Sequence, residues 1–178
     1  MFAKRKWTPS SDEEVLWNFG YAEIDSPTDH GNRWRAELEP QLLRILTTDD
    51  RRAMTKEDWA NLLAAAIAVR GDYVVQLMAL RLAWFRGHFG ISELRNIRVA
   101  DYPPFSGFAP SRRLQEFVRC MDEGRSMAGA EFADRYRKLR PSFDVQRVRG
   151  LPILVAESVD GPFTEVEGLT RLCILLSR

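Results

Sequence analysis

Residues 151–175, LPILVAESVDGPFTEVEGLTRLCIL, carry the pattern of two short strands that run directly into a helix. The β-branched run LPILVAE (151–157) predicts a strand, Asp160-Gly161-Pro162 predicts a turn, and FTEVE (163–167) predicts a second strand. Apolar spacing from Leu169 to Leu176 then predicts a helix. The segment is therefore expected to form a hairpin whose second strand leads into a helix at Gly168.

The junction at Gly168 has the residue types that a phosphate site needs. A glycine lets the backbone turn sharply and lets a ligand approach closely, and the first helical turn presents unpaired N–H groups that favour an anion. Leu169 would contribute only its N–H, whereas Thr170 adds a hydroxyl and Arg171 adds a forked cation. Gly168 to Arg171 are therefore candidate phosphate-binding or nucleotide-binding residues, and Arg171 is also a candidate catalytic residue.

Glu167 is unexpected beside a phosphate, because a carboxylate repels it unless it holds a metal ion, orients water or accepts a proton. Glu167 is therefore a candidate general base or Mg²⁺ ligand. The alternative is purely structural. In that case Gly168 is a tight turn, Thr170 caps the helix, and Arg171 faces solvent or forms a salt bridge.

The segment before this hairpin also predicts mixed structure. LRNIRVADY (94–102) alternates around Ile97 and Val99 and predicts a strand that ends in a turn at Pro103-Pro104. Ser111 is expected to cap a helix that ends at Gly124, with apolar positions Leu114, Phe117, Val118 and Met121. Residues 132–139 predict a shorter helix that ends before Pro141.

Residues 1–90 read as an all-helical part. Capping signals at Ser11 and Thr55 each precede an apolar helical pattern, and Gly71 separates two helices that we expect to form a helical hairpin. All five tryptophans lie in this part. We expect them to pack in the core or against a protein partner rather than to stack on bases.

The order of elements in residues 91–178 resembles the ParB/sulfiredoxin superfamily, in which a strand, a turn, a second strand and a Gly-X-X-Arg helix start form a phosphate-binding corner. The predicted strand 94–102 and the following helix also occur in the family's order. The resemblance implies an α+β fold with a small mixed sheet and flanking helices over 91–178. The helical part, 1–90, has no counterpart in this resemblance.

This chain departs from the Gly-X-X-Arg motif of individual family members, and these differences make some of their activities a poorer match than others. Leu169 stands where sulfiredoxins have cysteine, and a single arginine stands where chromosome-segregation ParB proteins have a pair. The Gly-X-Thr-Arg form is closer to the free-serine kinases of the family, although Leu169 replaces their histidine. Other members, among them plasmid-encoded factors that block conjugative DNA transfer, hydrolyse ATP and cleave DNA, and this class fits a single-motif domain with an arginine-rich flank.

Basic residues gather near the motif. The net charge is only +1, but six basic residues against one acid lie between Arg135 and Arg149. Local clustering of this kind indicates a phosphate-bearing partner. Lys138, Arg140, Arg147 and Arg149 are therefore candidate contacts to the DNA backbone. Arg112 and Arg113 open the helix after the first strand and are candidates for the nucleotide pocket, since the family often uses that place. The alternative is that this pair is simply solvated, as most arginine pairs at helix starts are.

The resulting prediction is a phosphate-binding enzyme that uses ATP or another nucleotide with Mg²⁺, has ATPase or DNase activity, and acts in plasmid conflict by inhibiting conjugative transfer. The alternatives are a small-molecule kinase, or a non-catalytic module that binds DNA or, through residues 1–90, a transfer or secretion-system protein. No apolar run is long enough for a membrane span, and the first 14 residues lack the apolar core of a secretory signal. We therefore expect a cytoplasmic protein.

Overall fold

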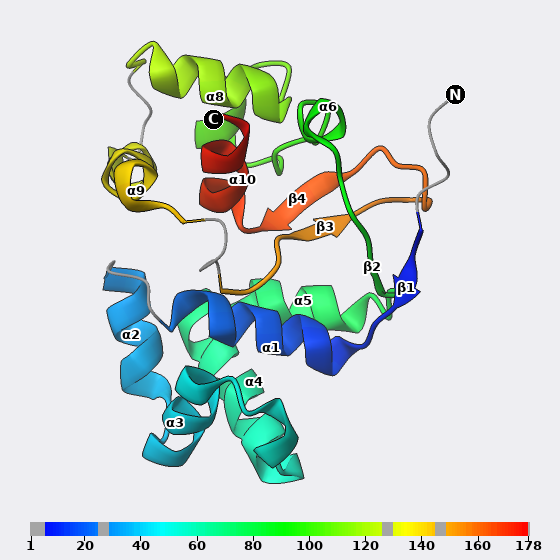
Figure 1. Ribbon diagram of the computed structural model, residues 1–178, viewed down its shortest axis with the longest axis vertical. Coiled ribbons are helices and arrows are strands. Elements are labelled where there is room, and N and C mark those ends of the chain that lie inside the picture. Colours follow the sequence, from blue (N-terminus) through cyan, green and yellow to red (C-terminus); the bar gives the residue numbers. More distant parts are fainter. Residues whose placement is uncertain (1–5, 25–28, 126–129, 145–148, 178) are drawn as a thin grey trace. The chain divides into compact units, whose positions relative to one another are not determined.

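The computed structural model describes residues 6–24, 29–125, 130–144 and 149–177 and shows a mixed α+β protein (Figure 1). The chain divides into two compact units, Met1–His88 and Phe89–Arg178. No helix in the described ranges is long and apolar enough to cross a bilayer.

The first unit is mainly helical. Its elements are β1 (Thr8–Pro9), α1 (Asp12–Glu23), α2 (Asp29–Glu37), α3 (Pro40–Thr48), η1 (Arg51–Ala53), α4 (Lys56–Arg70), α5 (Asp72–Ala79) and β2 (Phe85–Arg86). The expectation that this part is wholly helical is wrong in one detail, because β1 and β2 form a short antiparallel pair. Each strand has only two residues, which is too short to produce a period-two pattern in the sequence.

Both predicted helix starts in this unit are confirmed. The Ser11 hydroxyl accepts a hydrogen bond from the N–H of Glu14 at the start of α1. At the start of α4, Thr55 and Asp58 form a reciprocal capping box, in which the Thr55 N–H donates to the Asp58 carboxylate at 2.8 Å. Gly71 has a φ of 67° and ends α4, and α5 follows and packs against α4.

The core of the first unit lies between these helices. Trp34, Leu46 and Leu62 are completely buried there, and Trp17 is 5% exposed. The prediction that tryptophans serve as core residues is therefore confirmed for Trp17 and Trp34.

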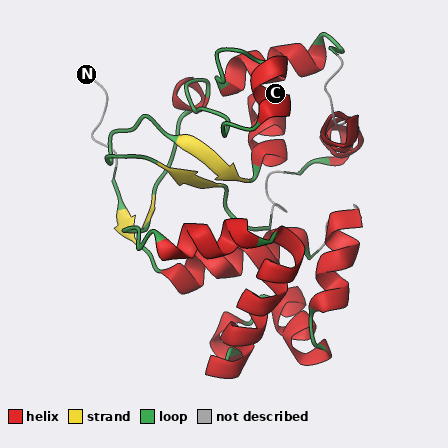
Figure 2. Ribbon diagram, turned by 180° about the vertical axis from the view of Figure 1, so that it is seen from behind, coloured by secondary structure: helices red, strands yellow, loops and turns green. Residues whose placement is uncertain are grey.

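The second unit combines helices with a β-hairpin. Its elements are α6 (Ile91–Leu94), α7 (Pro103–Phe108), α8 (Leu114–Asp122), α9 (Ala130–Leu139), η2 (Arg140–Ser142), β3 (Ile153–Val155), β4 (Thr164–Glu167) and α10 (Leu169–Leu176). β3 and β4 pair antiparallel, with an irregularity in register between Ile153 and Leu154. The predicted sequence of strand, turn, strand and helix is thus confirmed, and α10 follows directly from the end of β4 (Figures 1 and 2).

Two details upstream of the hairpin differ from the predictions. In 94–102 only Arg98 pairs as a strand residue, antiparallel to Arg113 and parallel to Thr164, and the two prolines begin helix α7 instead of a turn. The helix expected at Ser111 begins at Leu114, with no side-chain cap. The reason is the backbone of the three residues before it: Arg112 has a φ of 55°, outside the helical region, and Arg113 is engaged in the pair with Arg98.

The second core lies under this small pairing network. The main-chain pairs around Arg98 direct Ile97, Val99 and Leu114 inward, where they join Phe117 of α8 and Ile174 of α10. α8 and α10 pack against each other across this core. Helices α8 and α10 are therefore held together by one set of buried side chains.

Candidate phosphate-binding site

Gly168 adopts a conformation that favours glycine. Its φ is 94° and ψ is 19°, and α10 begins at the next residue without a side-chain cap. A Cβ atom added there would lie 2.8 Å from Arg171 Nη2 and 3.1 Å from Pro152 Cα. The space next to Gly168, where a ligand was expected to approach, is thus occupied by Arg171 and Pro152.

Arg171 folds back over this junction. Its Nη2 lies 3.7 Å from Glu167 Oε1, and its Nη1 donates to the Arg149 carbonyl at 3.4 Å. The two side chains are 15% and 10% exposed, so the pair is largely shielded from water. Arg171 Nε and Nη2 nevertheless have no hydrogen-bond partner among the described residues. The salt bridge foreseen in the structural alternative is present, but it leaves donors of a nearly buried guanidinium unused.

β4 turns its acidic side chains inward. Glu165 and Glu167 are buried, whereas Thr164 and Val166, which alternate with them along the strand, are partly exposed. Leu169 and Thr170 are 7% and 9% exposed. The junction is therefore a packed corner and not an open cradle.

Mg²⁺ binding by Glu167 stays a prediction. Its carboxylate lies beside Arg171, and magnesium usually binds through one or two carboxylates together with substrate phosphates. Within the described ranges, no group of three or more His, Cys, Asp or Glu side chains is placed to hold a metal ion.

A second feature of this unit is an open arginine-lined groove of about 800 Å³ beside the start of α8. Its lining residues are Arg98, Ser111, Arg112, Arg113, Gln115, Glu116 and Arg119. The structure thus brings the predicted pair Arg112 and Arg113 together with two arginines that the sequence analysis missed. Two signals pointed to them: Arg98 is a polar position in the alternating pattern 94–102, and Arg119 is on the helix that follows Arg113.

Arg98 and Arg113, which both line the groove, are paired with each other. The N–H of Val99 donates to the Arg112 carbonyl, and the N–H of Leu114 donates to the Ile97 carbonyl, at 2.7 and 2.8 Å. These bonds flank the pair and leave Arg98 and Arg113 as a non-hydrogen-bonded antiparallel pair, the type in which opposite side chains are closest. Both side chains are exposed, and neither forms an ion pair with any described residue.

The other charged residues of the groove have local partners. Arg112 is 3.0 Å from Asp101 and also donates to the Val99 carbonyl. Arg119 lies 3.6 Å from Glu116. Hydrogen bonds from the Ser111 side chain and backbone, and then the charge of Arg119, lower the pKa of Glu116. Glu116 is thus ionised at neutral pH and compensates Arg119, while the charges of Arg98 and Arg113 remain uncompensated.

The candidate DNA contacts are placed differently from one another. Arg140 is engaged within the protein: it pairs with Asp122 at 2.7 Å and lies over the ring of Tyr136. Lys138 is exposed on α9, Arg149 precedes β3 and is half-buried, and Arg147 lies outside the described residues.

Comparisons of the chain with protein-family models, with curated proteins and with solved structures give no match.

Proposed function

We propose that the second unit binds a phosphate-bearing ligand of the nucleotide or nucleic-acid class, and that Arg98 and Arg113 make the principal contacts. The observation that carries this proposal is the exposed, uncompensated arginine pair that lines the groove. Like charges directly opposite each other in a sheet are destabilising. A phosphate between two guanidinium groups would remove that repulsion and accept hydrogen bonds from both forks.

The described residues that line the groove offer arginines for binding a phosphate, but no unpaired carboxylate for bond cleavage. Glu116, the one carboxylate among these described lining residues, is paired with Arg119 and accepts a hydrogen bond from Ser111. The groove therefore supports a binding function on its own, and hydrolysis requires another part of the unit.

Hydrolysis of ATP or DNA is a second candidate function, supported by Arg171. Its unused N–H donors lie at the start of α10, where the first backbone N–H groups of a helix also lack intrahelical partners. A phosphate that displaced Glu167 from Arg171 would meet both sets of donors, and it would free the Glu167 carboxylate to accept a proton from water. Together with the resemblance to the ParB/sulfiredoxin superfamily, this arrangement supports a phosphohydrolase with a role in blocking conjugative transfer.

Binding at the groove is tested by fluorescence anisotropy with labelled single-stranded and duplex DNA, and by thermal shift with ATP, ADP and CTP. Arg98→Ala and Arg113→Ala should each weaken binding about tenfold, as expected for a lost hydrogen bond to a charged group. Arg44→Ala is the matched control, because Arg44 is an exposed arginine on α3 of the first unit. Equal binding by all three variants would refute the groove as the site.

Hydrolysis is tested separately. Glu167→Gln and Arg171→Ala should abolish release of phosphate from ATP or cleavage of DNA while groove binding persists. If the wild type binds but neither ATP nor DNA is cleaved, the unit is a binding module. Phosphorylation of free serine would instead identify a small-molecule kinase.

A further inference from the structure

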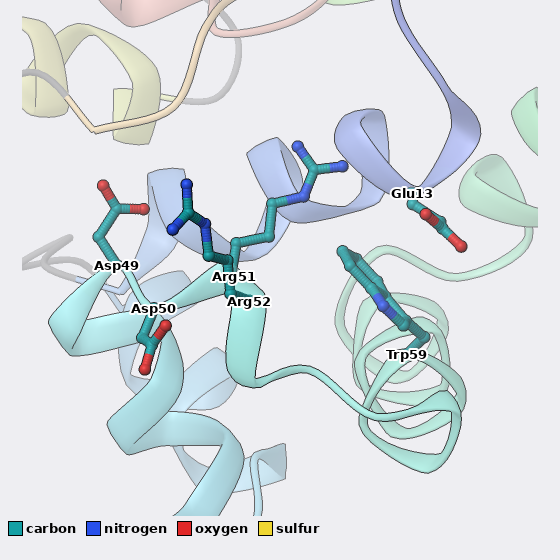
Figure 3. Close-up of a pocket in the computed structure, with 6 residues that line it drawn as sticks. All are labelled: Glu13, Asp49, Asp50, Arg51, Arg52 and Trp59. Carbon is teal, nitrogen blue, oxygen red and sulfur yellow. The ribbon is translucent and has the colours of Figure 1, made fainter.

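An open pocket of about 680 Å³ lies in the first unit, where three segments distant in sequence meet (Figure 3). It is lined by Glu13 from α1, Asp49 and Asp50 after α3, Arg51 and Arg52 of η1, and Trp59 of α4. Its volume is within the range of small-molecule sites, which is roughly 300 to 1,000 Å³.

Local backbone structure holds the charged residues of the pocket in place. α3 ends at Asp49, which has a left-handed conformation with a φ of 55° and whose N–H donates to the Leu46 carbonyl. The N–H of Asp50 donates to the Ile45 carbonyl at 3.0 Å, and η1 begins at the next residue. The capping box at Thr55 then starts α4 and places Trp59 in its first turn.

Trp59 provides an aromatic surface that is in contact with a cationic side chain of the protein itself. Its ring meets the edge of the buried Trp17 at 6.3 Å and 61°, which fixes the ring against the core. The guanidinium of Arg51 lies over the Trp59 ring, 5.7 Å from the ring centroid. The geometry is that of a cation–π contact, and tryptophan is the best side chain for one.

The charges of the pocket are of both signs and are not paired with one another. No salt bridge or side-chain hydrogen bond joins Glu13, Asp49 or Asp50 to either arginine in the part of the chain that the structure describes. Figure 3 shows the two aspartates on one side of the arginines, with Trp59 and Glu13 on the other side. A ligand with one positive and one negative group would therefore find a partner for each.

We infer that this pocket binds a small ammonium zwitterion. The ammonium group would lie over the Trp59 ring, facing Glu13, and would take the place of the Arg51 guanidinium. Arg51 would then turn with Arg52 toward the carboxylate of the ligand, where both can donate forked hydrogen bonds. A simple anion would leave the ring and Glu13 unused, and a simple cation would leave the arginines unused.

The test is an NMR titration of the full chain, followed at the indole N–H of Trp59, whose signal is assigned by its loss in Trp59→Phe. The probes are glycine betaine as the zwitterion, tetramethylammonium as the cation alone and acetate as the anion alone, at matched ionic strength. Glycine betaine should shift the Trp59 signal, and each single ion should bind at least about fivefold more weakly.

Variants of exposed residues separate binding from folding. Glu13→Gln and Arg52→Ala should each weaken betaine binding about two- to fivefold, which is the range of an exposed charge pair. Asp72→Asn, an exposed acid in the first turn of α5, is the matched control and should not change it. The inference is overturned by the absence of a betaine shift, by equally tight binding of tetramethylammonium, or by unchanged affinity in both Glu13→Gln and Arg52→Ala.

Discussion

Arg98 and Arg113 stand opposite each other in a non-hydrogen-bonded antiparallel pair, and neither has an acidic partner among the described residues. Repulsion between their guanidinium groups opposes folding of the second unit, whereas the buried neighbours Ile97, Val99 and Leu114 favour it. The two positive charges that would favour binding of an anion therefore lower the stability of the protein when no anion is bound.

Replacing one arginine of this pair should not destabilise the protein. Arg113→Ala removes a like-charge contact, so the free energy of unfolding should stay equal or rise by up to about 1 kcal/mol. Urea unfolding at low and high salt measures it, and the gain should shrink at high salt because salt screens the repulsion. A loss of more than about 1 kcal/mol would show that Arg113 makes a stabilising contact instead. Arg44→Ala serves as the control here too.

Gly168→Ala should destabilise the second unit through two effects. The left-handed φ of 94° is unfavourable for alanine, and the new Cβ would meet Arg171 and Pro152 at 2.8 and 3.1 Å or slightly more. We expect a loss of about 2 kcal/mol or more in the free energy of unfolding. Gly124→Ala is the matched control, because Gly124 has a φ of 70° and nothing lies within 4 Å of its added Cβ. The difference between the two variants measures crowding alone, and equal losses would contradict close packing at Gly168.

The ion pair between Arg70 and Glu23 should contribute to the free energy of unfolding of the first unit. Their side chains are 21% and 7% exposed, and the closest atoms are 2.8 Å apart. Arg70→Ala removes an ion-pair partner of a buried carboxylate and should cost up to about 3 kcal/mol. The double variant Arg70→Met/Glu23→Leu removes both charges and should recover much of the loss. Thermal unfolding of the single and double variants checks this, and a double variant as unstable as Arg70→Ala would contradict the charge-burial explanation.

The carboxyl group of Glu116 should titrate below its usual range. Ser111 lowers its pKa chiefly by hydrogen bonding, so Ser111→Ala should move the titration midpoint upward, and the backbone N–H should keep part of the effect. Because the pKa is lower in the folded state, the associated stability is present above the unfolded pKa and is lost as pH falls through the folded value. Carbon-detected NMR of the glutamate carboxyls measures the midpoint. Ser158→Ala, in an exposed turn, should leave it unchanged, and a Glu116 midpoint that is the same in Ser111→Ala would refute this assignment.

The two cysteines should react slowly in the folded protein. Burial raises the pKa of Cys173 well above its usual value, and burial also raises that of Cys120. Because the thiolate is the reactive form, a thiol reagent at mildly alkaline pH should label neither residue until the chain unfolds. Labelling in increasing urea tests this, and fast modification of Cys173 without denaturant would contradict its burial in the core that α8 and α10 share.

Patterns in the sequence predicted the elements whose signals are local. The capping residues Ser11 and Thr55, the glycine at 71 and the hairpin that leads into Gly168 were all recognisable, because each depends on neighbouring residues. The pairing of Arg98 with both Arg113 and Thr164 was not predictable, since it depends on contacts distant in sequence. The late start of α8 follows from the same contacts.

The candidate site was predicted only in part for the same reason. The sequence indicated the order Glu167, Gly168, Thr170 and Arg171, but not that β4 would turn Glu167 inward or that Pro152 would pack on the glycine. Arg112 and Arg113 were singled out by position, whereas Arg98 becomes a site residue only through its partner strand. Side-chain neighbours across strands are set by register, which single-sequence patterns specify weakly here.

In the contact between Glu167 and Arg171, the Glu167 carboxylate serves as an internal anion at the start of α10. A phosphate that bound at this corner would have to displace the Glu167 carboxylate from Arg171. The free energy of the contact between Glu167 and Arg171 would then lower the affinity for phosphate. Binding of a phosphate at this corner would then change the conformation of the hairpin, because Glu167 is the last residue of β4, the strand that pairs with β3.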